Sequence, residues 1–582
     1  MTMKECIQLT INNRSVTVTR GEKLFDIIQR EGFRIPNYCQ GRGNCGKCRV
    51  RLEGMYSDIT PEEAENLSEE EQKKGIRLAC QVVVEGNGCV WIENEENPVI
   101  VSSGKQPADI GGFSSPLMLR ALESKDNKLS MDISLAEKRL KNNEAYHFNL
   151  SVLKKLATLN NGQDYSFLIR EKEVIDCIKK DIQNCIYGVA FDIGTTTLVA
   201  YLIDMFTGRE INSAAMLNPQ GVYGDDVLSR ISYCDEPNGL EMLNGIIIRA
   251  INELIASLCR LSSIDQKEIY EITVVGNPTM CQLFLNIPPY YIGRAPYSPA
   301  YRSCCSISSA ESGLIVNPVG KITVLPNISG YVGSDIVAGI LASQIYKGNK
   351  PCALMDIGTN GEIVVANNGE MVACSAAAGP AFEGGRIQLG MRAVEGAVYS
   401  VDKNGVNVIG NGKPKGFCGS GIVDAVAFLL DNGVVNNKGI IRNCENVRRL
   451  KNQAAYYFNP SLYVTQNDIR EVQLAKSAIY TALKLALHEL GLEMEDLDKI
   501  YIAGSFGSYL NLQSSMRIGL LPELGLEKFV QIGNSAGSGA KMALIDLETR
   551  AIAEDIKNNV HYLELSLNSL FQRQFIENLV FG

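Results

Sequence analysis

The chain contains very little histidine: three residues, His147, His488 and His561, among 582. So few histidines exclude a multi-histidine metal site and argue against a Ser–His–Asp catalytic apparatus. They also exclude the D-x-H-x-x-G signature of cobalamin-binding proteins, because none of the three has an aspartate two positions before it. We therefore expect each histidine to be structural.

Long runs of one residue class are missing too. No stretch is strongly basic and the formal net charge is −9, so nucleic acid is not expected as a partner. No run of about 18 apolar residues occurs, so no membrane span is expected. The first residues, Met-Thr-Met-Lys-Glu-Cys, lack the apolar core of a signal peptide. Without such a signal, the 17 cysteines of the chain indicate a reducing cytoplasm.

A group of four cysteines near the start is the most informative feature that is present. Cys39, Cys45 and Cys48 have the spacing C-x5-C-x2-C, and Cys80 follows at a distance. Three thiolates in one short loop and a fourth farther along are typical of ligands to a [2Fe–2S] cluster. Structural zinc is the main alternative, but zinc sites usually show two compact pairs of ligands, and only Cys45 and Cys48 form one here.

The residues around these cysteines fit a ferredoxin. Three glycines in the cluster loop suit backbone that bends tightly around sulfide, with φ above zero. Alternating apolar residues before and after Asn12-Asn13 predict a hairpin, and residues 23–30 predict a short helix. Hairpin, helix, cluster loop and late cysteine together resemble a β-grasp ferredoxin domain. The glycines are Gly41, Gly43 and Gly46.

The length of 582 residues predicts several domains, and changes in composition along the chain indicate their boundaries. Residues 1–98 hold the ferredoxin-like unit, and residues 99–116 are rich in Gly, Ser and Pro, which indicates a linker. Residues 117–186 form a small middle domain with no recognisable chemistry, so we expect a connector or docking domain. Residues 187–582 form the largest unit.

An internal repeat marks that largest unit. Asp-Ile-Gly-Thr occurs at residues 192–195 and again at 356–359, each time between two apolar strands. The repeat predicts a duplicated, two-lobed domain with one hairpin per lobe. Helices are expected at residues 240–261 and 421–431.

The repeated turn suits the phosphates of ATP. Glycine lets the backbone approach a phosphate, threonine supplies hydroxyl and N–H donors, and a carboxylate at a strand end suits Mg²⁺. A third segment, a strand that runs into a Gly-rich turn at residues 500–507, suits adenosine. The predicted phosphate-binding residues are Gly194, Thr195, Thr196, Thr197, Gly358, Thr359 and Asn360, those near Mg²⁺ are Asp192 and Asp356, and those near adenosine are Gly504, Ser505 and Gly507.

With these motifs, residues 188–582 resemble the ATPase superfamily of actin, sugar kinases and heat-shock chaperones. The whole chain resembles the reductive activators of corrinoid proteins, which join a [2Fe–2S] domain to such an ATPase. The segments 217–231, 325–335, 376–384 and 518–522 support the resemblance. One position departs from it: Cys281 stands where relatives often carry a histidine after G-N-x-x-M, so no role of that histidine is carried over.

The resemblance implies a multidomain α+β and α/β protein: a β-grasp ferredoxin, a small middle domain and a two-lobed actin-like ATPase. It implies ATP-dependent reduction of cob(II)alamin to cob(I)alamin on a corrinoid protein of a methyltransferase system, with a low-potential electron donor. A homodimer is plausible on the same ground. Asp335, near the start of a helix expected at residues 336–346, stands where related sugar kinases place a catalytic base. The alternative is that Asp335 only caps that helix.

Other functions also fit the motifs. One is a small-molecule kinase with a ferredoxin-type sensor domain, and another is an ATP-dependent docking or chaperone module that transfers no electron. A third is a plain ferredoxin-type carrier with a vestigial ATPase domain, against which the intact pair of Asp-Ile-Gly-Thr turns argues.

Overall fold

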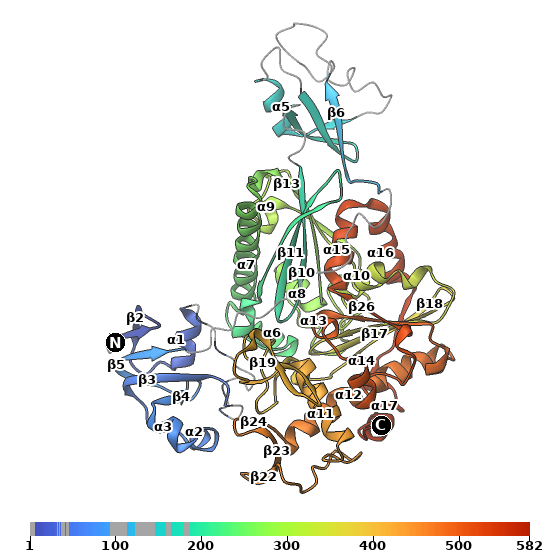
Figure 1. Cartoon of the computed structure of the whole chain (residues 1–582). Helices are drawn as coiled ribbons and strands as arrows, with labels where there is room; N and C mark the ends of the chain where they lie inside the picture. Colours follow the sequence, from blue (N-terminus) through green and yellow to red (C-terminus); the bar gives the residue numbers. More distant parts are fainter. Residues whose placement is uncertain are drawn as a thin grey trace.

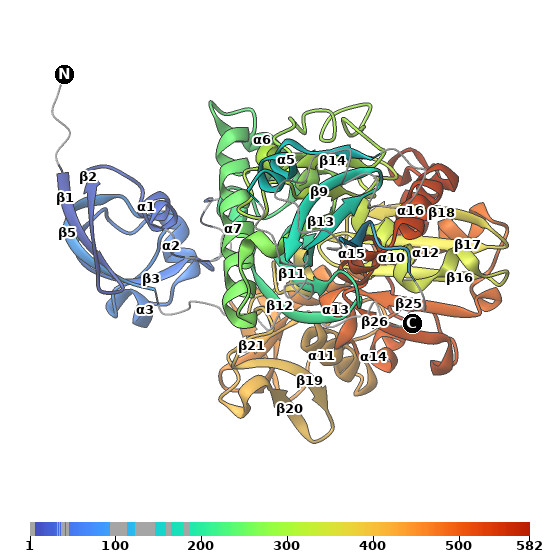
Figure 2. The same ribbon diagram turned by 90° about the horizontal axis from the view of Figure 1, so that it is seen from above.

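The chain folds into an N-terminal domain, a small four-stranded domain and a large two-lobed body (Figure 1). In the view from above, the N-terminal domain stands to one side of the body (Figure 2). The candidate ligands Cys39 and Cys45 and most of the expected linker lie outside the described residues. The computed structural model describes residues 6–31, 33, 35, 41, 43, 46–92, 113–122, 146–158, 165–179 and 186–582.

The N-terminal domain is a five-stranded sheet with the strand order β2-β1-β5-β3-β4. The predicted hairpin is β1 and β2, which pair antiparallel, while β1 pairs with β5 in parallel. Ile7, Leu9 and Ile11 alternate with exposed residues because every second side chain of β1 faces the core. The β-grasp prediction is confirmed. The elements are β1 (Cys6–Ile11), β2 (Arg14–Thr19), α1 (Leu24–Arg30), β3 (Arg49–Tyr56), α2 (Pro61–Asn66), α3 (Glu69–Lys73), β4 (Ile76–Leu78) and β5 (Val84–Trp91).

The small domain that the sequence left without chemistry is a sheet with the order β6-β8-β9-β7 and one helix. Its core is separate and centres on Val152, Phe167 and Val174. Figure 1 shows it at the end of the body farthest from the N-terminal domain. Its elements are β6 (Leu117–Leu122), β7 (His147–Phe148), α5 (Leu150–Leu156), β8 (Tyr165–Arg170) and β9 (Glu173–Lys179).

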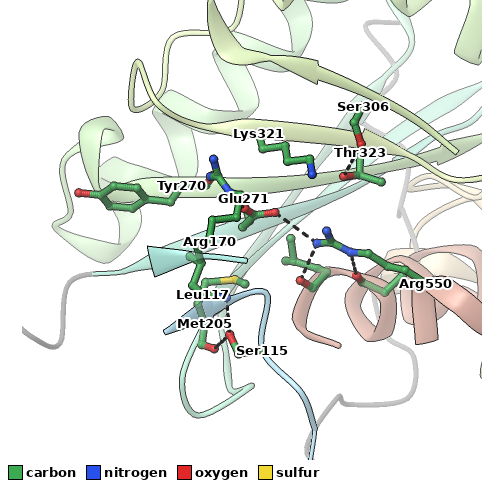
Figure 3. A network of polar contacts seen from close by, with 12 residues as sticks. Ser115, Leu117, Arg170, Met205, Tyr270, Glu271, Ser306, Lys321, Thr323 and Arg550 are labelled. Atoms are coloured by element: carbon green, nitrogen blue, oxygen red, sulfur yellow. Dashed lines mark hydrogen bonds and ion pairs between the residues drawn. The ribbon is translucent and has the colours of Figure 1, made fainter. Parts of the chain in front are cut away.

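A buried ion triad joins this small domain to the body (Figure 3). Arg170 at the end of β8 donates through Nε to Oε1 of Glu271 (2.6 Å), and Arg550 donates through Nη2 to Oε2 (3.3 Å). Arg170 also donates to the main-chain oxygen atoms of Tyr270 and Val319. Glu271 is fully buried, so its charge depends on the two guanidinium groups.

The body contains two six-stranded sheets, one in each lobe. The sheet of the first lobe has the order β12-β11-β10-β13-β15-β14, and that of the second lobe β26-β25-β16-β17-β18-β27. Helices α10 (Ser334–Ser343) and α15 (Ser535–Ile545) pack against each other between the sheets, in a core that both lobes share. The first sheet contains β10 (Tyr187–Ile193), β11 (Thr197–Asp204), β12 (Glu210–Leu217), β13 (Ile269–Gly276), β14 (Cys305–Ser308) and β15 (Lys321–Val324). The second contains β16 (Cys352–Ile357), β17 (Gly361–Asn367), β18 (Glu370–Ala376), β25 (Lys499–Ala503), β26 (Phe529–Gly533) and β27 (Val560–Tyr562).

The outer face of each sheet is covered by a long helix, α7 in the first lobe and α12 in the second. The predicted helices at 240–261 and 421–431 are α7 and α11. The helices of the body are α6 (Val227–Tyr233), α7 (Gly239–Ser262), α8 (Pro278–Phe284), α9 (Ser309–Ser312), α10 (Ser334–Ser343), α11 (Gly419–Asp431), α12 (Gln466–Glu489), α13 (Gly504–Ser508), α14 (Leu512–Arg517), α15 (Ser535–Ile545), α16 (Leu547–Asn559) and α17 (Phe571–Glu577). Two small sheets complete the second lobe: β19 (Ala397–Asp402), β20 (Gly405–Val408) and β21 (Gly416–Phe417), then β22 (Val447–Leu450), β23 (Gln453–Asn459) and β24 (Leu462–Thr465).

Among the described residues, α7 alone has the length and apolar composition of a membrane span. Half of its most apolar stretch is buried in the protein, where Leu243, Ile247 and Ile251 pack on the first sheet. A core helix passes the same test of composition, so α7 is weak evidence for a membrane span.

Candidate functional site

The described half of the predicted cluster site is built from the ends of β3 and β4. Cys48 directly precedes β3 and Cys80 follows β4, and both side chains are buried in the core of the domain. The N–H of Ala79 donates to the carbonyl oxygen of Cys48 (2.8 Å), which holds the two ligand segments together. The predicted positive φ is found at Gly41, Gly43 and Gly46.

Gln81 adds a donor next to the predicted ligand Cys80. Its Nε2 donates to the carbonyl oxygen of Gly41 (2.9 Å) and lies 3.4 Å from Cys80 Sγ. Hydrogen bonds to ligand sulfur stabilise thiolate and influence the reduction potential of a cluster. Buried thiols, left-handed glycines and this amide fit a [2Fe–2S] cluster. Cys39 and Cys45, the other two predicted ligands, lie outside the described residues.

The two Asp-Ile-Gly-Thr segments form hairpin turns that open onto one cavity of about 940 Å³ between the lobes. Each turn is closed by a main-chain hydrogen bond: Gly194 N–H donates to Thr197 (2.9 Å), and Gly358 N–H donates to Asn360 (2.9 Å). A side chain at residue 194 would come within 2.8 Å of the carbonyl oxygen of Thr197, so the first turn requires glycine. The structure thus brings the two halves of the repeat to one site. The predicted residues that line the cavity are Asp192, Gly194, Thr195, Thr196, Thr197, Asp335, Asp356, Gly358, Thr359, Asn360 and Gly504.

Polar side chains from other elements hold the first turn in place. Asn277 Nδ2 donates to Thr195 Oγ1 (3.0 Å), and Asn218 Nδ2 donates to the carbonyl oxygen of Gly194 (2.8 Å). Arg230, which is fully buried, donates to the carbonyl oxygen of Thr195 (2.5 Å). These contacts orient the threonine hydroxyl and main-chain N–H groups before any phosphate arrives.

Among the carboxyl groups in the wall of the cavity, those of Asp192, Asp335, Asp356 and Glu362 act on one another. Burial raises the pKa of Asp192 to about 6, and it raises the pKa of Asp335 and of Asp356 to about 7, with the neighbouring carboxylates adding to both shifts. Burial raises the pKa of Glu362 well above its usual value. A nearby cation would relieve this repulsion, so the cluster suits Mg²⁺.

No three carboxylate, thiolate or imidazole groups in the described part of the chain are close enough together to hold a metal ion. The acids therefore fit a Mg²⁺ ion whose inner ligands are phosphate oxygens and waters, with Asp192 and Asp356 in the outer shell. Asn534 Nδ2 donates to Asp192 Oδ2 (2.9 Å) and orients that carboxylate toward the site.

Asp335 is not the N-cap residue of its helix. Helix α10 begins at Ser334 with Gly333 at the N-cap, and Asn327 Oδ1 accepts the N–H of Ser334 (3.2 Å). The Asp335 carboxylate accepts the N–H of Ile336 (2.9 Å) in the first turn of the helix, and it lines the cavity. The geometry leaves it available to orient a water molecule, as a catalytic base requires.

The segment predicted for adenosine is a short helix, α13, rather than a glycine-rich turn. Gly504 has φ of +88°, and a Cβ there would lie 2.8 Å from Oδ1 of Asp356, so glycine is required beside the second turn. We predicted that Gly507 lies near adenosine, but Gly507 does not line the cavity. It packs against Ile502, and its carbonyl oxygen accepts a hydrogen bond from Gln531. The side chain of Ser505 lies outside the described part.

The sequence prediction missed Glu383, which bridges the two turns. Its Oε2 accepts the hydroxyl of Thr196 (3.0 Å) and its Oε1 accepts the hydroxyl of Thr359 (2.5 Å). Glu383 lies in the segment 376–384, which the sequence flagged as similar to relatives but to which it assigned no role. A carboxylate thus holds the two hydroxyls that were predicted to bind phosphate.

Cys281, at the position where relatives often have histidine, is fully buried and does not line the cavity. Its Sγ lies 3.5 Å from the carbonyl oxygen of Gly276 and 3.5 Å from Ser334 Oγ, and burial raises the pKa of the thiol to about 12. A neutral, buried thiol here acts as a small core residue.

Three family models match the chain. The model of a 2Fe-2S iron-sulfur cluster binding domain matches residues 9–85. The model of the RACo middle region matches residues 187–348, and that of the C-terminal domain of RACo, the ASKHA domain, matches residues 350–582. The last two matches meet between the lobes, just before β16.

One relative and one solved structure match nearly the whole chain, and a second relative matches part of it. The "Corrinoid activation enzyme RamQ" of Eubacterium limosum is 32% identical and covers 97% of both chains. The "[Co(II) methylated amine-specific corrinoid protein] reductase" of Methanosarcina barkeri is 24% identical over 62% of this chain and 70% of its own. A solved "Reductive activator for corrinoid,iron-sulfur protein" has a TM-score of 0.74 at 30% identity and covers 99% of this chain and 98% of its own.

Proposed function

Because the chain belongs to the family of corrinoid activation enzymes, we propose that it uses ATP to drive the reduction of cob(II)alamin to cob(I)alamin on a partner corrinoid protein. Cys39, Cys45, Cys48 and Cys80 would hold a [2Fe–2S] cluster, and that cluster would supply one-electron transfer between a low-potential donor and cobalt. The donor is oxidised by one electron and cobalt is reduced by one, so the redox step balances.

The observation that carries the proposal is the pair of Asp-Ile-Gly-Thr turns, one from each lobe, on a single cavity in a chain that also has a ferredoxin fold. A nucleotide held by both turns binds the closed arrangement of the lobes more tightly than the open one. That difference in affinity is what lets ATP shift a conformational equilibrium toward an uphill step.

The residues divide the nucleotide chemistry among them. Thr195, Thr196 and Thr359 would hold phosphate oxygens, and Asp192 and Asp356 would orient the waters of a Mg²⁺ ion. Asp335 orients the attacking water. These three roles are the ones that phosphoryl transfer needs: positioned donors, a cation and an oriented nucleophile.

A spectral assay tests the proposal. The cluster-loaded protein is mixed anaerobically with a low-potential reductant, Mg²⁺, ATP and a corrinoid protein encoded beside it, and the cob(I)alamin absorbance is followed. We expect cob(I)alamin with ATP and little without it. Absence of cob(I)alamin with every neighbouring corrinoid protein would overturn the proposal, and a phosphorylated small molecule formed from ATP would indicate a kinase instead.

A further inference from the structure

Lys47 connects the predicted cluster loop to the second lobe. It stands between the predicted ligands Cys45 and Cys48. Its Nζ donates to the carbonyl oxygen atoms of Gln388 (2.9 Å) and Gly390 (2.9 Å), more than 300 residues along the chain. An ammonium group on two carbonyl oxygens is a charge-assisted contact, stronger than a neutral hydrogen bond.

The acceptors of Lys47 belong to a compact segment, residues 380–392, which we call the Glu383 turn. Gly385 N–H donates to Pro380 (2.8 Å), and Gly390 N–H donates to Ile387 (3.0 Å). A Cβ at Gly390 would lie 2.2 Å from the carbonyl oxygen of Gly384, so the chain passes close to itself here. Such tight packing lets the turn shift as one unit.

The Glu383 turn also belongs to the nucleotide cavity. Arg386, Met391 and Arg392 line that cavity. The Glu383 carboxylate accepts hydrogen bonds from the hydroxyl groups of Thr196 and Thr359. A triphosphate that uses the same hydroxyls must displace Glu383, because two anions compete for the same donors and repel each other.

We infer that Glu383 and Lys47 are positioning residues that couple nucleotide binding in the cleft to the placement of the cluster loop. Displacement of Glu383 shifts the turn, and Lys47 carries the shift to the chain segment beside Cys48. This deepens the proposed function and rests on its nucleotide and cluster sites. The chain of contacts runs from the hydroxyl groups of Thr196 and Thr359 to Glu383, then to the carbonyl oxygens of Gln388 and Gly390, and ends at Lys47.

Asp468 faces the same place from helix α12. Its Oδ1 accepts the N–H of Gln388 (2.6 Å), and the positive charge of Lys47 lies close enough to act on its carboxylate. Gln388 is therefore held on its N–H side by the second lobe and on its carbonyl side by the N-terminal domain. A shift of the turn must therefore either move Lys47 with it or break the hydrogen bonds of Lys47.

A second lysine supplies a matched control. Lys451, at the turn between β22 and β23, donates through Nζ to the carbonyl oxygen of Glu65 in the N-terminal domain. Its ammonium group also donates to a main-chain carbonyl oxygen across the interface between the N-terminal domain and the second lobe. Lys451 itself, however, belongs neither to the Glu383 turn nor to the cavity lining. If Lys47 only attached the domain, Lys47 and Lys451 would be equivalent.

Hydrogen exchange of the cluster-loaded full chain, with and without Mg²⁺ and the β,γ-imido analogue of ATP, tests the coupling. In the wild type we expect the analogue to change exchange at least twofold both in residues 380–392 and in residues 46–52. In Lys47→Met only the change in 380–392 remains. Lys47→Arg restores both changes, and Lys451→Met keeps both.

Glu383→Ala tests the other end without touching the cluster loop. Because the Glu383 carboxylate then no longer holds the two threonine hydroxyls, residues 46–52 should exchange without nucleotide as they do in the nucleotide-bound wild type. Persistence of the cluster-loop change in Lys47→Met, or its absence in the wild type when the cavity responds, overturns the coupling and leaves the proposed function standing. Absence of any nucleotide effect in the wild type overturns both.

Discussion

Asp335 is the residue on which hydrolysis should depend most. We expect Asp335→Asn to lower the ATP hydrolysis rate by about 10²- to 10⁴-fold, the usual contribution of a general base. Nucleotide affinity should change little, because phosphate contacts come from the threonine turns. Steady-state hydrolysis and equilibrium binding measure the two effects.

A buried aspartate outside the cavity lining is the control for that change. Asp424 in α11 accepts the N–H of Val401 (3.3 Å) and does not line the cavity. Asp424→Asn should keep hydrolysis near the wild-type rate. Full hydrolysis by Asp335→Asn would remove Asp335 from the mechanism.

The raised pKa values of Asp335 and Asp356, both about 7, predict how stability depends on pH. Between pH 4 and 7 the folded state holds more protons on these groups than the unfolded state does. The free energy of unfolding of the nucleotide-free protein should therefore fall as pH rises through that window. Asp356→Asn should lessen this fall and stabilise the protein at pH 8 by about 1–2 kcal/mol, since one pKa unit corresponds to about 1.4 kcal/mol and the group partly faces the open cavity.

Denaturant unfolding at pH 5 and pH 8 without nucleotide measures this effect. Mg²⁺ with ATP should abolish the difference between variant and wild type, because the cation compensates the charges. A wild type whose stability is the same at both pH values, or a variant no more stable at pH 8, would contradict the electrostatic argument.

At the level of elements, the triad of Glu271 on β13, Arg170 on β8 and Arg550 on α16 joins three segments that are distant in sequence (Figure 3). Glu271→Gln leaves two guanidinium groups without a buried counter-charge, so we expect a loss of about 3–5 kcal/mol in the free energy of unfolding. Denaturant titration followed by circular dichroism measures it.

An exposed ion pair provides the comparison. Glu577 pairs with Arg573 one turn earlier on α17, and both side chains are more than half exposed. Glu577→Gln should cost less than about 1 kcal/mol, because exposed pairs are well solvated. Equal losses for the two variants would mean that the triad does not stabilise the joint.

At the scale of the whole molecule, the proposal requires two separable functions in one chain. Cys45→Ser removes one predicted cluster ligand, so formation of cob(I)alamin should be abolished while binding of nucleotide and of the corrinoid partner persists. Absorbance of the cluster, the cob(I)alamin assay and a pull-down with the partner measure the three properties.

Cys444→Ser is the control, because Cys444 is an exposed cysteine in the second lobe. It should retain cluster, nucleotide binding and reduction. If Cys45→Ser still formed cob(I)alamin, electron transfer through the N-terminal cluster would be refuted; this outcome would favour a docking module whose partner is reduced by another route.

Local pattern predicted the elements well, because it reports which face of each segment is buried. The alternation of Ile7, Leu9 and Ile11 predicted β1, and the two Asp-Ile-Gly-Thr copies predicted two hairpins on two lobes. The pattern around Ile500 was less informative: strand β25 was correct, but a glycine-rich sequence suits a turn and a helix start equally, and the helix α13 was missed.

Residue type and spacing predicted the chemistry of residues that are close together in the sequence: cysteine ligands in a short loop, and glycine with threonine in a tight turn. Contacts between residues far apart in sequence depend on how the lobes and domains pack, and no local pattern reports that. Glu383 contacts two threonine hydroxyls, and Lys47 contacts two carbonyl oxygens, because sheets, helices and a separate domain meet at these places. The contacts of both residues could therefore be found only in the tertiary structure.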